Sequence, residues 1–381
     1  MITNLKIKNF KPHKETSLRL SGLTVLTGIN GSGKTSFIQA LLLLRQTFQK
    51  GRLMDGLDLN KPLCSVGIGN DALYRYASEG VIVFEWQTEN GEIFKMKFNS
   101  DENALNDSFL NKLEYSENVS PERLANEALF NNHFQYISAN RWGGVSVFPK
   151  ETYAAETQKQ LSLEYGQGEL VAQFLYKFGS DTVLDYTGST EEDLSLLNQT
   201  LYWERKISPQ VLLHVESGKD SNSYAISYGY SAGEQLRPIQ NLKAENVGYG
   251  ISYTLPVVVA LLSAEPGSLL IIENPEAHLH PAGQAELAKL MVLAVRNGVQ
   301  VMVETHSDHI ISGIQLACKE YGKNDDKGIS KDQVSLYYFS NDVNHDLVIE
   351  NIGIEDNGRL KYQPKGFFDQ AEIDMFQLYD D

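Results

Sequence analysis

The sequence predicts an α/β fold with a mixed central sheet that is mostly parallel at its centre. Short apolar stretches typical of buried strands, such as residues 268–272 and 299–307, alternate with stretches of helical spacing such as 280–297. This alternation is typical of a parallel sheet covered by helices. The second observation is a glycine-rich loop between 17–28, which has strand character, and 34–49, which has helical spacing. A buried strand followed by such a loop and a helix is typical of the opening of a nucleotide-binding fold.

The remaining elements follow in chain order. Residues 2–10 are expected to form a strand, and residues 81–98 a β-hairpin around Asn90-Gly91, a dipeptide typical of tight turns. Residues 99–132 are polar and are expected to form a helical or irregular insertion, before strand character returns at 134–141. The pattern also predicts helices at 155–180, 190–205 and 245–263, strands with turns at 208–232, a charged loop at 322–333 and two further strands.

Composition limits what the chain can do. Its 381 residues suffice for two or three domains at roughly 150 residues each. Lysine and arginine total 33 against 49 acidic residues, and the net charge of −16 disfavours non-specific nucleic-acid binding over the whole surface. Cys64 and Cys318 are too few for a disulfide framework. Without a signal-peptide core or an apolar run near ~20 residues, we expect a cytoplasmic chain with no membrane partner.

The glycine-rich loop carries the strongest functional signal. Residues 28–35, Gly-Ile-Asn-Gly-Ser-Gly-Lys-Thr, fit the phosphate-loop pattern G-x-x-x-x-G-K-[ST] without a mismatch. Glycines let the backbone curl around a pyrophosphate with its N–H groups pointing inward, and the following helix adds its positive amino end. We expect Lys34 to reach the β- and γ-phosphates and the Thr35 hydroxyl to bind Mg²⁺.

Two further apolar strands end in polar side chains, which the topology would bring beside this loop. Glu273 ends the first strand, and a carboxylate there can hold Mg²⁺ and position the attacking water. Glu276 lies three residues further and could face the same site. The second strand ends in Glu304 and His306, and the imidazole could contact the γ-phosphate or the lytic water.

Two groups of side chains fit more than one role. His278, His280 and His306 could bind zinc together with one of the carboxylates. The two-residue spacing of His278 and His280 suits a strand better than the helix start expected there, which favours a capping or interface role for this pair. Arg141 could be an arginine finger or one side of a buried ion pair.

Together these segments resemble the ABC-type ATPase heads of the SMC/RecF-like class, and most closely the stand-alone bacterial AAA-family ATPases related to the OLD proteins. GINGSGKTS resembles that family's Walker A motif, IIENPEAHLHP its Walker B motif with the attached D-loop, and VETHSDHII its switch-histidine strand. ENVGYGISYTLPVV lies where the family keeps its signature helix, and ITNLKIKNFKPHKETSLRL resembles its N-terminal hairpin. The resemblance implies a P-loop NTPase with a mixed central sheet, an N-terminal antiparallel β subdomain and a helical insertion.

The resemblance also implies roles for individual residues. The residues that would bind ATP and Mg²⁺ are Gly28, Asn30, Gly31, Ser32, Gly33, Lys34, Thr35 and Ser36. The implied catalytic set is Glu273, Glu276, His306 and Lys34, with Thr35 and Glu273 as the metal positions. The signature positions Gly248, Gly250 and Ser252 would contact the γ-phosphate of a nucleotide bound to a second subunit. The resemblance therefore implies an ATP-dependent homodimer.

The chain departs from the family pattern at one important place. The usual Asp-Glu pair of the Walker B motif is Glu273-Asn274 here. Because asparagine cannot accept a proton as a general base, Glu276 or Glu304 becomes the candidate for activating water, or hydrolysis is slow. The signature likewise departs from the common Leu-Ser-Gly-Gly-Gln form.

These inferences lead to one expected organisation and one expected function. We expect an N-terminal ATPase lobe at 1–100, an inserted lid at 101–245 that contains the core strand 134–141, and a C-terminal ATPase lobe at 246–381. The expected function is a slow ATPase that dimerises around Mg-ATP and regulates a partner effector, such as a nuclease or toxin, in a bacterial defence module. A DNA-binding repair or sensing ATPase and an ATP-binding scaffold with little turnover are the alternatives.

Overall fold

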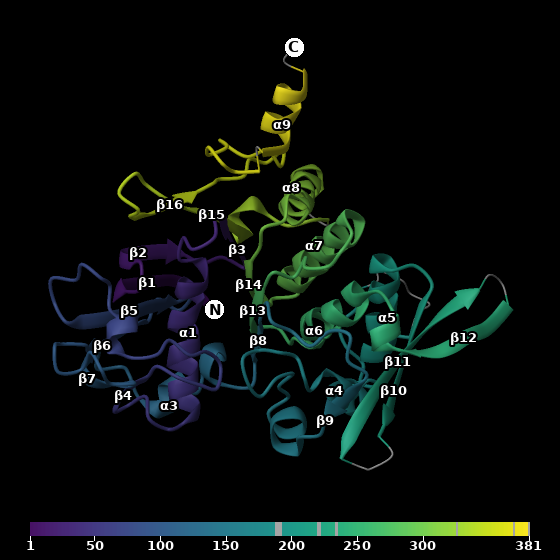
Figure 1. Ribbon diagram of the computed structural model, residues 1–381, viewed down its shortest axis with the longest axis horizontal. Helices are drawn as coiled ribbons and strands as arrows, with labels where there is room; N and C mark the ends of the chain where they lie inside the picture. Colours follow the sequence, from purple (N-terminus) through teal and green to yellow (C-terminus); the bar gives the residue numbers. More distant parts are fainter. Residues whose placement is uncertain (187–192, 219–221, 233–234, 325–326, 369, 380–381) are drawn as a thin grey trace.

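The computed structural model describes residues 1–186, 193–218, 222–232, 235–324, 327–368 and 370–379. Within this part of the chain the strands form three sheets (Figure 1). The central sheet lies between an N-terminal antiparallel sheet and a group of helices. No helix in the described ranges is both long and apolar enough to cross a membrane.

The central sheet is mixed, as predicted. Its strands are β3 (Leu23–Gly28), β8 (Phe134–Ile137), β13 (Leu269–Glu273), β14 (Gln300–Glu304), β15 (Val334–Asn341) and β16 (Leu347–Asn351). In space they follow the order β16-β15-β3-β14-β13-β8, in which only the β15–β16 pair is antiparallel among the described strands. The carboxyl ends of β3, β14 and β13 therefore lie at one edge, where polar residues that follow these strands meet.

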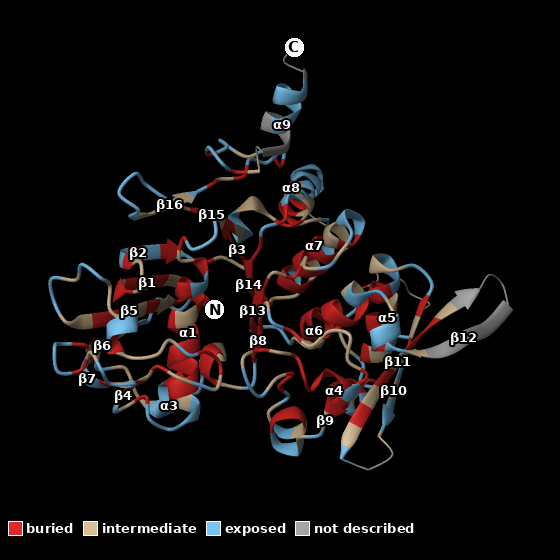
Figure 2. Ribbon diagram, in the orientation of Figure 1, coloured by how far each residue is buried: buried red, intermediate tan, exposed pale blue. Residues whose placement is uncertain are grey.

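Helices cover both faces of this sheet because its strands are apolar on both sides. The helices are α1 (Lys34–Gln49), α6 (Tyr249–Ser263), α7 (Pro281–Arg296) and α8 (Asp308–Lys323). Leu269 and Ile271 of β13 belong to the core that contains α1, whereas Leu270 and Ile272 belong to the core that contains the other three helices. Figure 2 shows β13 and β14 buried along their length.

The N-terminal sheet is antiparallel and packs against the other side of α1. Its strands are β1 (Ile2–Phe10), β2 (His13–Arg19), β4 (Gly56–Asp58), β5 (Val81–Thr88), β6 (Ile93–Asn99) and β7 (Phe109–Tyr115). They are arranged in the order β2-β1-β5-β6-β7-β4. Ile7 of β1 and Phe84 of β5 share one core with Leu41 of α1, so the helix is buried between two sheets.

One prediction for this lobe is confirmed and another is wrong. The hairpin of β5 and β6 turns at Asn90-Gly91, where Gly91 has φ +80°. Residues 109–115, expected within a helical or irregular insertion, instead pair with β6 as β7. Only Leu110 of β7 is buried, so the strand lacks the apolar alternation that would reveal it, and main-chain pairing holds it in place.

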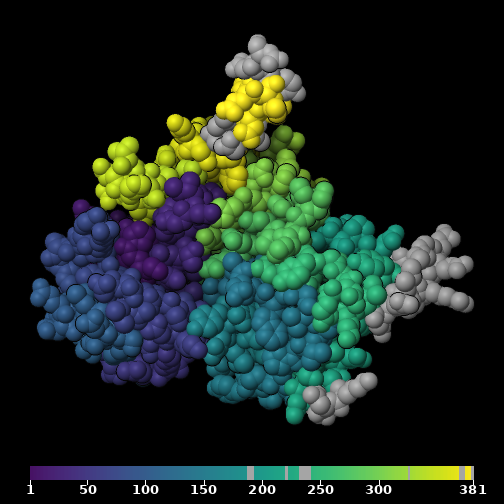
Figure 3. Space-filling view, in the orientation of Figure 1, coloured from purple at the N-terminus to yellow at the C-terminus, as the bar shows by residue number. Residues whose placement is uncertain are grey.

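A third region, residues 147–243, contains a sheet beside helices. Its strands and helices are β9 (Val147–Pro149), α4 (Val171–Phe178), α5 (Leu196–Ile207), β10 (Val211–Ser217), β11 (Ser223–Ala232) and β12 (Gln235–Lys243). The sheet has the order β10-β11-β12, and β9 pairs with β11. In Figure 3 this teal region and the purple-to-blue N-terminal lobe occupy opposite sides of the molecule.

The predicted helix 155–180 is wrong over most of its length. A π-helical turn covers Tyr153–Thr157, and the regular helix begins at α4. Lys159, Tyr165 and Gly166 between them have φ values of 52°, 57° and 63°, which a right-handed helix cannot contain. The predicted helix 190–205 corresponds to α5, and residues 190–192 lie outside the described part of the chain.

The other predicted helices are confirmed, and the short elements complete the fold. The segments 245–263 and 280–297 correspond to α6 and α7. The short elements are α2 (Gly69–Ala72), α3 (Pro121–Leu124), η1 (Ala128–Phe130), η3 (Ala244–Asn246) and η4 (Lys331–Gln333). The last helix, α9 (Gln370–Tyr379), projects from the body of the molecule (Figure 1).

Candidate nucleotide site

The loop between β3 and α1 has the backbone that its glycines predict. Gly28, Gly31 and Gly33 have φ values of +134°, +75° and +100°. These conformations strain any residue with a Cβ, so the curl of the loop depends on glycine. At Gly28 a Cβ would stand 2.0 Å from the carbonyl oxygen of Phe339, so the close approach of β15 also requires glycine there.

Lys34 and Ser32 both form hydrogen bonds with main-chain carbonyls of this loop. The Lys34 ammonium donates hydrogen bonds to the carbonyls of Gly28 (3.1 Å) and Ile29 (2.8 Å). The Ser32 hydroxyl donates to the same Ile29 carbonyl over 2.7 Å. Burial lowers the pKa of Lys34, and the negative charge of Glu304 partly offsets this shift. The lysine is thus held where a phosphate bound in the loop would meet its charge.

A cavity of about 450 Å³ opens over the loop. Its lining residues are Lys11, Pro12, Asn30, Gly31, Ser32, Gly33, Lys34, Thr35, Ser36, Asn274, Glu304 and His306. It therefore joins most of the predicted phosphate loop to the ends of two other segments, 269–274 and 300–306. Lys11 and Pro12, from the turn between β1 and β2, are wall residues that the sequence analysis did not identify, since no local motif marks them.

Glu304 is the carboxylate that contacts Thr35, one of the two predicted metal ligands. The Thr35 hydroxyl donates to both Glu304 oxygens, at 2.9 and 3.1 Å. This contact follows from the strand order, because β14 lies between β3 and β13. Burial and the adjacent charge of Glu273 together raise the pKa of Glu304 to about 7, against the opposing effects of Thr35 and Lys34.

Glu273, predicted as the metal-associated acid, has different partners. Tyr136 on β8 donates its hydroxyl to one carboxylate oxygen over 3.0 Å, and the Ala139 amide donates to the other over 3.2 Å. Its side chain is 7% exposed, and burial raises the pKa of the carboxyl. In the parallel register Glu273 is the partner of Glu304 on the next strand, close enough for its charge to raise the pKa of Glu304.

Asn274 places a polar group at the cavity. Its backbone is left-handed, with φ +43°, and its amide donates to the Glu304 carbonyl over 2.7 Å. The side-chain oxygen of Asn274 is buried and has no hydrogen-bond partner among the described residues. A buried acceptor without a partner is costly to the folded state.

Glu276 and His306 meet through the backbone. The His306 amide donates to a Glu276 carboxylate oxygen over 2.7 Å, while the exposed imidazole of His306 lines the cavity. Burial raises the pKa of Glu276 and lowers that of His306, and the charge of Lys34 lowers the latter further. The structure thus brings the predicted switch histidine to the phosphate loop.

The predicted signature residues lie elsewhere in the same chain. Gly248 precedes α6, and Gly250 packs so closely that a Cβ would stand 2.5 Å from the His278 carbonyl oxygen. The Ser252 hydroxyl accepts from the Gly144 amide (2.8 Å) and donates to the Tyr249 carbonyl (3.1 Å). Ser252 thus helps to pack the start of α6, and its contact with a second subunit stays a prediction.

The predicted zinc alternative finds no geometric support. The Nδ1 atom of His280 accepts from the Ala282 amide over 3.3 Å and caps α7. The ring of His278 makes edge contacts with Tyr249 and Tyr253, with centroids 4.7 and 5.0 Å apart. In the described ranges no group of three or more His, Cys, Asp or Glu side chains is arranged to hold a metal ion.

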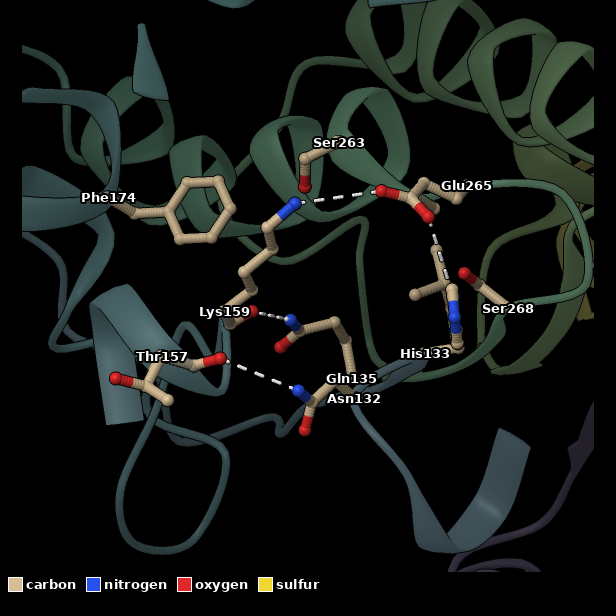
Figure 4. A pocket seen from close by; sticks show the side chains of 11 residues that line it. Asn132, His133, Gln135, Thr157, Lys159, Phe174, Ser263, Glu265 and Ser268 are labelled. Atoms are coloured by element: carbon tan, nitrogen blue, oxygen red, sulfur yellow. Dashed lines mark hydrogen bonds and ion pairs between the residues drawn. The ribbon is translucent and has the colours of Figure 1, made fainter. Parts of the chain in front are cut away.

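A second hollow lies at the opposite, amino-terminal edge of β8 and β13 (Figure 4). The side chains of Lys159 and His133 face the carboxylate of Glu265, at 3.6 and 3.8 Å. All three are about half exposed, so water screens these pairs and they contribute little. This hollow provides a place for control substitutions remote from the phosphate loop.

His13, the first residue of β2, contacts the phosphate loop at Gly33. Its ring is fully buried, with Nε2 3.1 Å from the Gly33 carbonyl oxygen and Nδ1 3.0 Å from the Thr16 hydroxyl. The carbonyl can only accept, so Nε2 carries the proton and Nδ1 accepts from Thr16. Burial, with a smaller contribution from the charge of Lys11, lowers the pKa of His13 to about 4, although the bond to Gly33 opposes the shift.

We expect His13 to weaken the fold in mild acid. In the unfolded chain His13 binds a proton below its ordinary pKa near 6.5. In the folded chain it stays neutral until the pH falls to about 4. The free energy of unfolding should therefore fall by about 3 kcal/mol for this group between pH 7 and 4. The measurement is urea unfolding of wild type and His13→Gln across this range. The difference between the two should shrink as pH falls, and a constant difference would contradict the assignment.

Comparisons with known proteins agree with this arrangement. The family model of the AAA ATPase domain matches residues 1–142 and 70–311, and a family described as a protein of unknown function (DUF3696) matches residues 329–378. A search of the curated proteins finds no match.

Solved structures of SMC heads resemble the fold. An SMC head bound to the C-winged helix domain of ScpA is 13% identical with a TM-score of 0.53, over 92% of this chain and 98% of that one. The SMC head from Thermotoga maritima is 12% identical with a TM-score of 0.50, over 93% and 99%. A Pyrococcus furiosus SMC head with an extended coiled coil, bound to the C-terminal domain of ScpA, is 11% identical with a TM-score of 0.53, over 99% of both chains.

These matches confirm the predicted SMC-like, ABC-type head fold, while the OLD-like subgroup stays a prediction. The likeness to the solved structures shows the fold alone at these identities. The AAA family model, by contrast, covers most of the sequence, including the phosphate loop and the segments that end in Glu273 and Glu304. The chain therefore belongs to the AAA ATPase domain family.

Proposed function

We propose that this chain binds ATP with Mg²⁺ and hydrolyses it. The observation that carries the proposal is the Thr35–Glu304 contact at a phosphate loop whose glycines have the required backbone. A hydroxyl and a carboxylate are oxygen ligands of the kind Mg²⁺ prefers, and Mg²⁺ usually takes only one or two protein ligands and keeps several waters. Glu273 and Glu304 stand side by side, so a divalent cation here would also relieve their repulsion.

The residues at and beside the cavity have separate roles in this proposal. The amides of the phosphate loop and the Lys34 ammonium bind the phosphates. Thr35 and Glu304 hold Mg²⁺, and Glu273 supports Glu304 from the next strand. Bound Mg²⁺ neutralises phosphate charge that develops during the reaction.

Three residues are candidates to act on the attacking water, of which Asn274 and His306 line the cavity and Glu276 does not. Asn274, which lines the cavity, orients the water by a hydrogen bond, which needs no transfer of a proton. His306 contacts the γ-phosphate from the other side of the cavity. Glu276 is the remaining candidate base and touches the His306 backbone. Because the strongest base of the family pattern is replaced by Asn274, we expect slow turnover.

We further propose that a second copy of the chain closes over the nucleotide through the start of α6. Gly248 has open space where a side chain would stand, and Tyr249 beside it is 46% exposed, so this end of α6 is accessible. Two of the similar SMC heads are bound to a domain of ScpA, which supports a protein partner of some kind. That the partner is an effector such as a nuclease or toxin, in a defence module, is a proposal from the family resemblance.

Replacing Lys34 should test the ATPase proposal most directly. In Lys34→Ala we expect phosphate release to fall by about 100-fold or more, because the charge that contacts the β- and γ-phosphates is removed. The measurement is phosphate release from ATP with Mg²⁺. Lys159→Ala, from the hollow at the opposite edge of the sheet, is the matched control and should stay within about twofold of wild type. A wild type no faster than Lys34→Ala would instead indicate the ATP-binding scaffold.

A further inference from the structure

Arg141 is a buried cation bonded to main-chain carbonyls. Its guanidinium is 3% exposed and donates to the carbonyls of Ser138 (2.7 Å), Glu273 (2.6 Å) and Asn274 (2.8 Å). Its fourth bond, from Nε to the Tyr253 carbonyl on α6, spans 3.1 Å. Within its own subunit Arg141 therefore acts neither as an arginine finger nor as one side of a buried ion pair, the two roles considered from the sequence.

The acceptors of Arg141 come from three segments that surround the site. Ser138 follows β8, whose Tyr136 holds the Glu273 carboxylate. Glu273 and Asn274 form the carboxyl end of β13, and Tyr253 lies on the first turns of α6. The guanidinium also stacks 4.4 Å from the Tyr253 ring, which fixes its plane.

The bond to the Asn274 carbonyl has a specific geometric effect. Asn274 adopts a left-handed backbone, in which the orientation of its carbonyl and the direction of its side chain are linked. Holding the two successive carbonyls of Glu273 and Asn274 on one planar guanidinium fixes this conformation. Asn274, one of the residues that line the cavity, is thereby held in place.

We propose that Arg141 is a positioning residue for ATP hydrolysis, which sets Asn274 at the cavity and couples it to the start of α6. The inference rests on the proposed ATPase function. Arg141 touches no atom of the phosphate loop in the described contacts, so its loss should leave nucleotide binding intact and slow turnover. A movement of α6 when a second subunit engages it would reach Asn274 through the single guanidinium that bonds both.

The test compares two buried arginines. Arg45 on α1 is also 3% exposed, donates to the carbonyls of Leu129 and Asn131, and lies 4.4 Å from the Phe134 ring, but it is remote from Asn274. In Arg141→Lys we expect kcat to fall about 10- to 100-fold, as for a catalytic group misplaced by ~1 Å. The Kd for a non-hydrolysable ATP analogue should stay within about threefold. Arg45→Lys should lower Tm by a similar amount and leave kcat within about threefold.

A double-mutant cycle asks whether Arg141 acts through Asn274. If it does, Asn274→Ala and Arg141→Lys together should slow kcat no more than the worse single variant. Multiplied effects, an unchanged kcat in Arg141→Lys, or equal losses of kcat in both lysine variants would overturn the inference. Arg141→Gln, which retains a planar donor, replaces Arg141→Lys if that variant does not fold. A wild type without hydrolysis would instead reject the ATPase proposal, so the two failures are distinguishable.

Discussion

Glu304→Gln should abolish the Mg²⁺ dependence of ATP hydrolysis. The substitution keeps the shape of the side chain and an oxygen that can accept from Thr35, but removes the charge. Losing one preorganised charged group at a reacting phosphate costs about 100- to 1,000-fold in rate. We therefore expect phosphate release to fall by about 100-fold, with the residual rate insensitive to added Mg²⁺. The measurement is a Mg²⁺ titration at saturating ATP.

Glu273→Gln is the matched control for this experiment. Its carboxylate is held by Tyr136 and Ala139 rather than by Thr35, so its amide variant should retain Mg²⁺-dependent hydrolysis with a loss of about tenfold. The family pattern makes the opposite prediction, since it places Glu273 at the metal. If Glu273→Gln loses the Mg²⁺ response and Glu304→Gln keeps it, the family assignment is correct and the one from the structure is wrong.

Gly28→Ala should destabilise the whole chain. The new Cβ would stand 2.0 Å from the carbonyl oxygen and 2.7 Å from the amide nitrogen of Phe339, neither of which can move without breaking the β3–β15 pairing. A positive φ costs a residue with a Cβ about 1–2 kcal/mol, and overpacking adds about 1–3 kcal/mol. We expect the free energy of unfolding to fall by about 3 kcal/mol or more, measured by urea unfolding, with loss of ATP binding in calorimetry.

The control for this prediction is Gly91→Ala in the β5–β6 turn. Gly91 also has a positive φ, of +80°, but no atom lies within 4 Å of a Cβ added there. Only the backbone strain then applies, so the loss should be about 1 kcal/mol and ATP binding should be unchanged. If both variants lose the same free energy of unfolding, the close approach of β15 is not the reason that Gly28 is required.

Local patterns predicted the parts of the site that local geometry determines. The phosphate loop was predicted residue by residue, because its glycine spacing dictates the backbone and the flanking strand and helix are strongly apolar. The ends of β13 and β14 were predicted to lie beside it because both follow buried strands. His306 lines the cavity, as does Asn274, whereas the predicted catalytic residues Glu273 and Glu276 are not among its lining residues.

Relations between distant strands could not be predicted in the same way. Nothing in the local sequence states that β14 lies between β3 and β13, and this order decides that Glu304 rather than Glu273 contacts Thr35. The Tyr136 contact that removes Glu273 from the loop is likewise non-local, since 137 residues separate the pair.

Fold predictions failed where periodicity was weak or misleading. The strand β7 has one buried side chain and therefore no alternating pattern to detect. The stretch 155–180 contains apolar residues at helical spacing, yet Lys159, Tyr165 and Gly166 adopt left-handed backbones that interrupt it. In both cases contacts made by the folded chain outweighed local preference.

The pairing of β3 with β15 joins the two families that match this sequence. The Ile29 amide, at the start of the phosphate loop, donates to the Phe339 carbonyl over 3.1 Å, and Phe339 belongs to the segment matched by DUF3696. That segment therefore pairs directly with the strand that leads into the phosphate loop, through main-chain hydrogen bonds. The C-terminal end that follows β16 is therefore connected to the phosphate loop through two paired strands, β16 and β15.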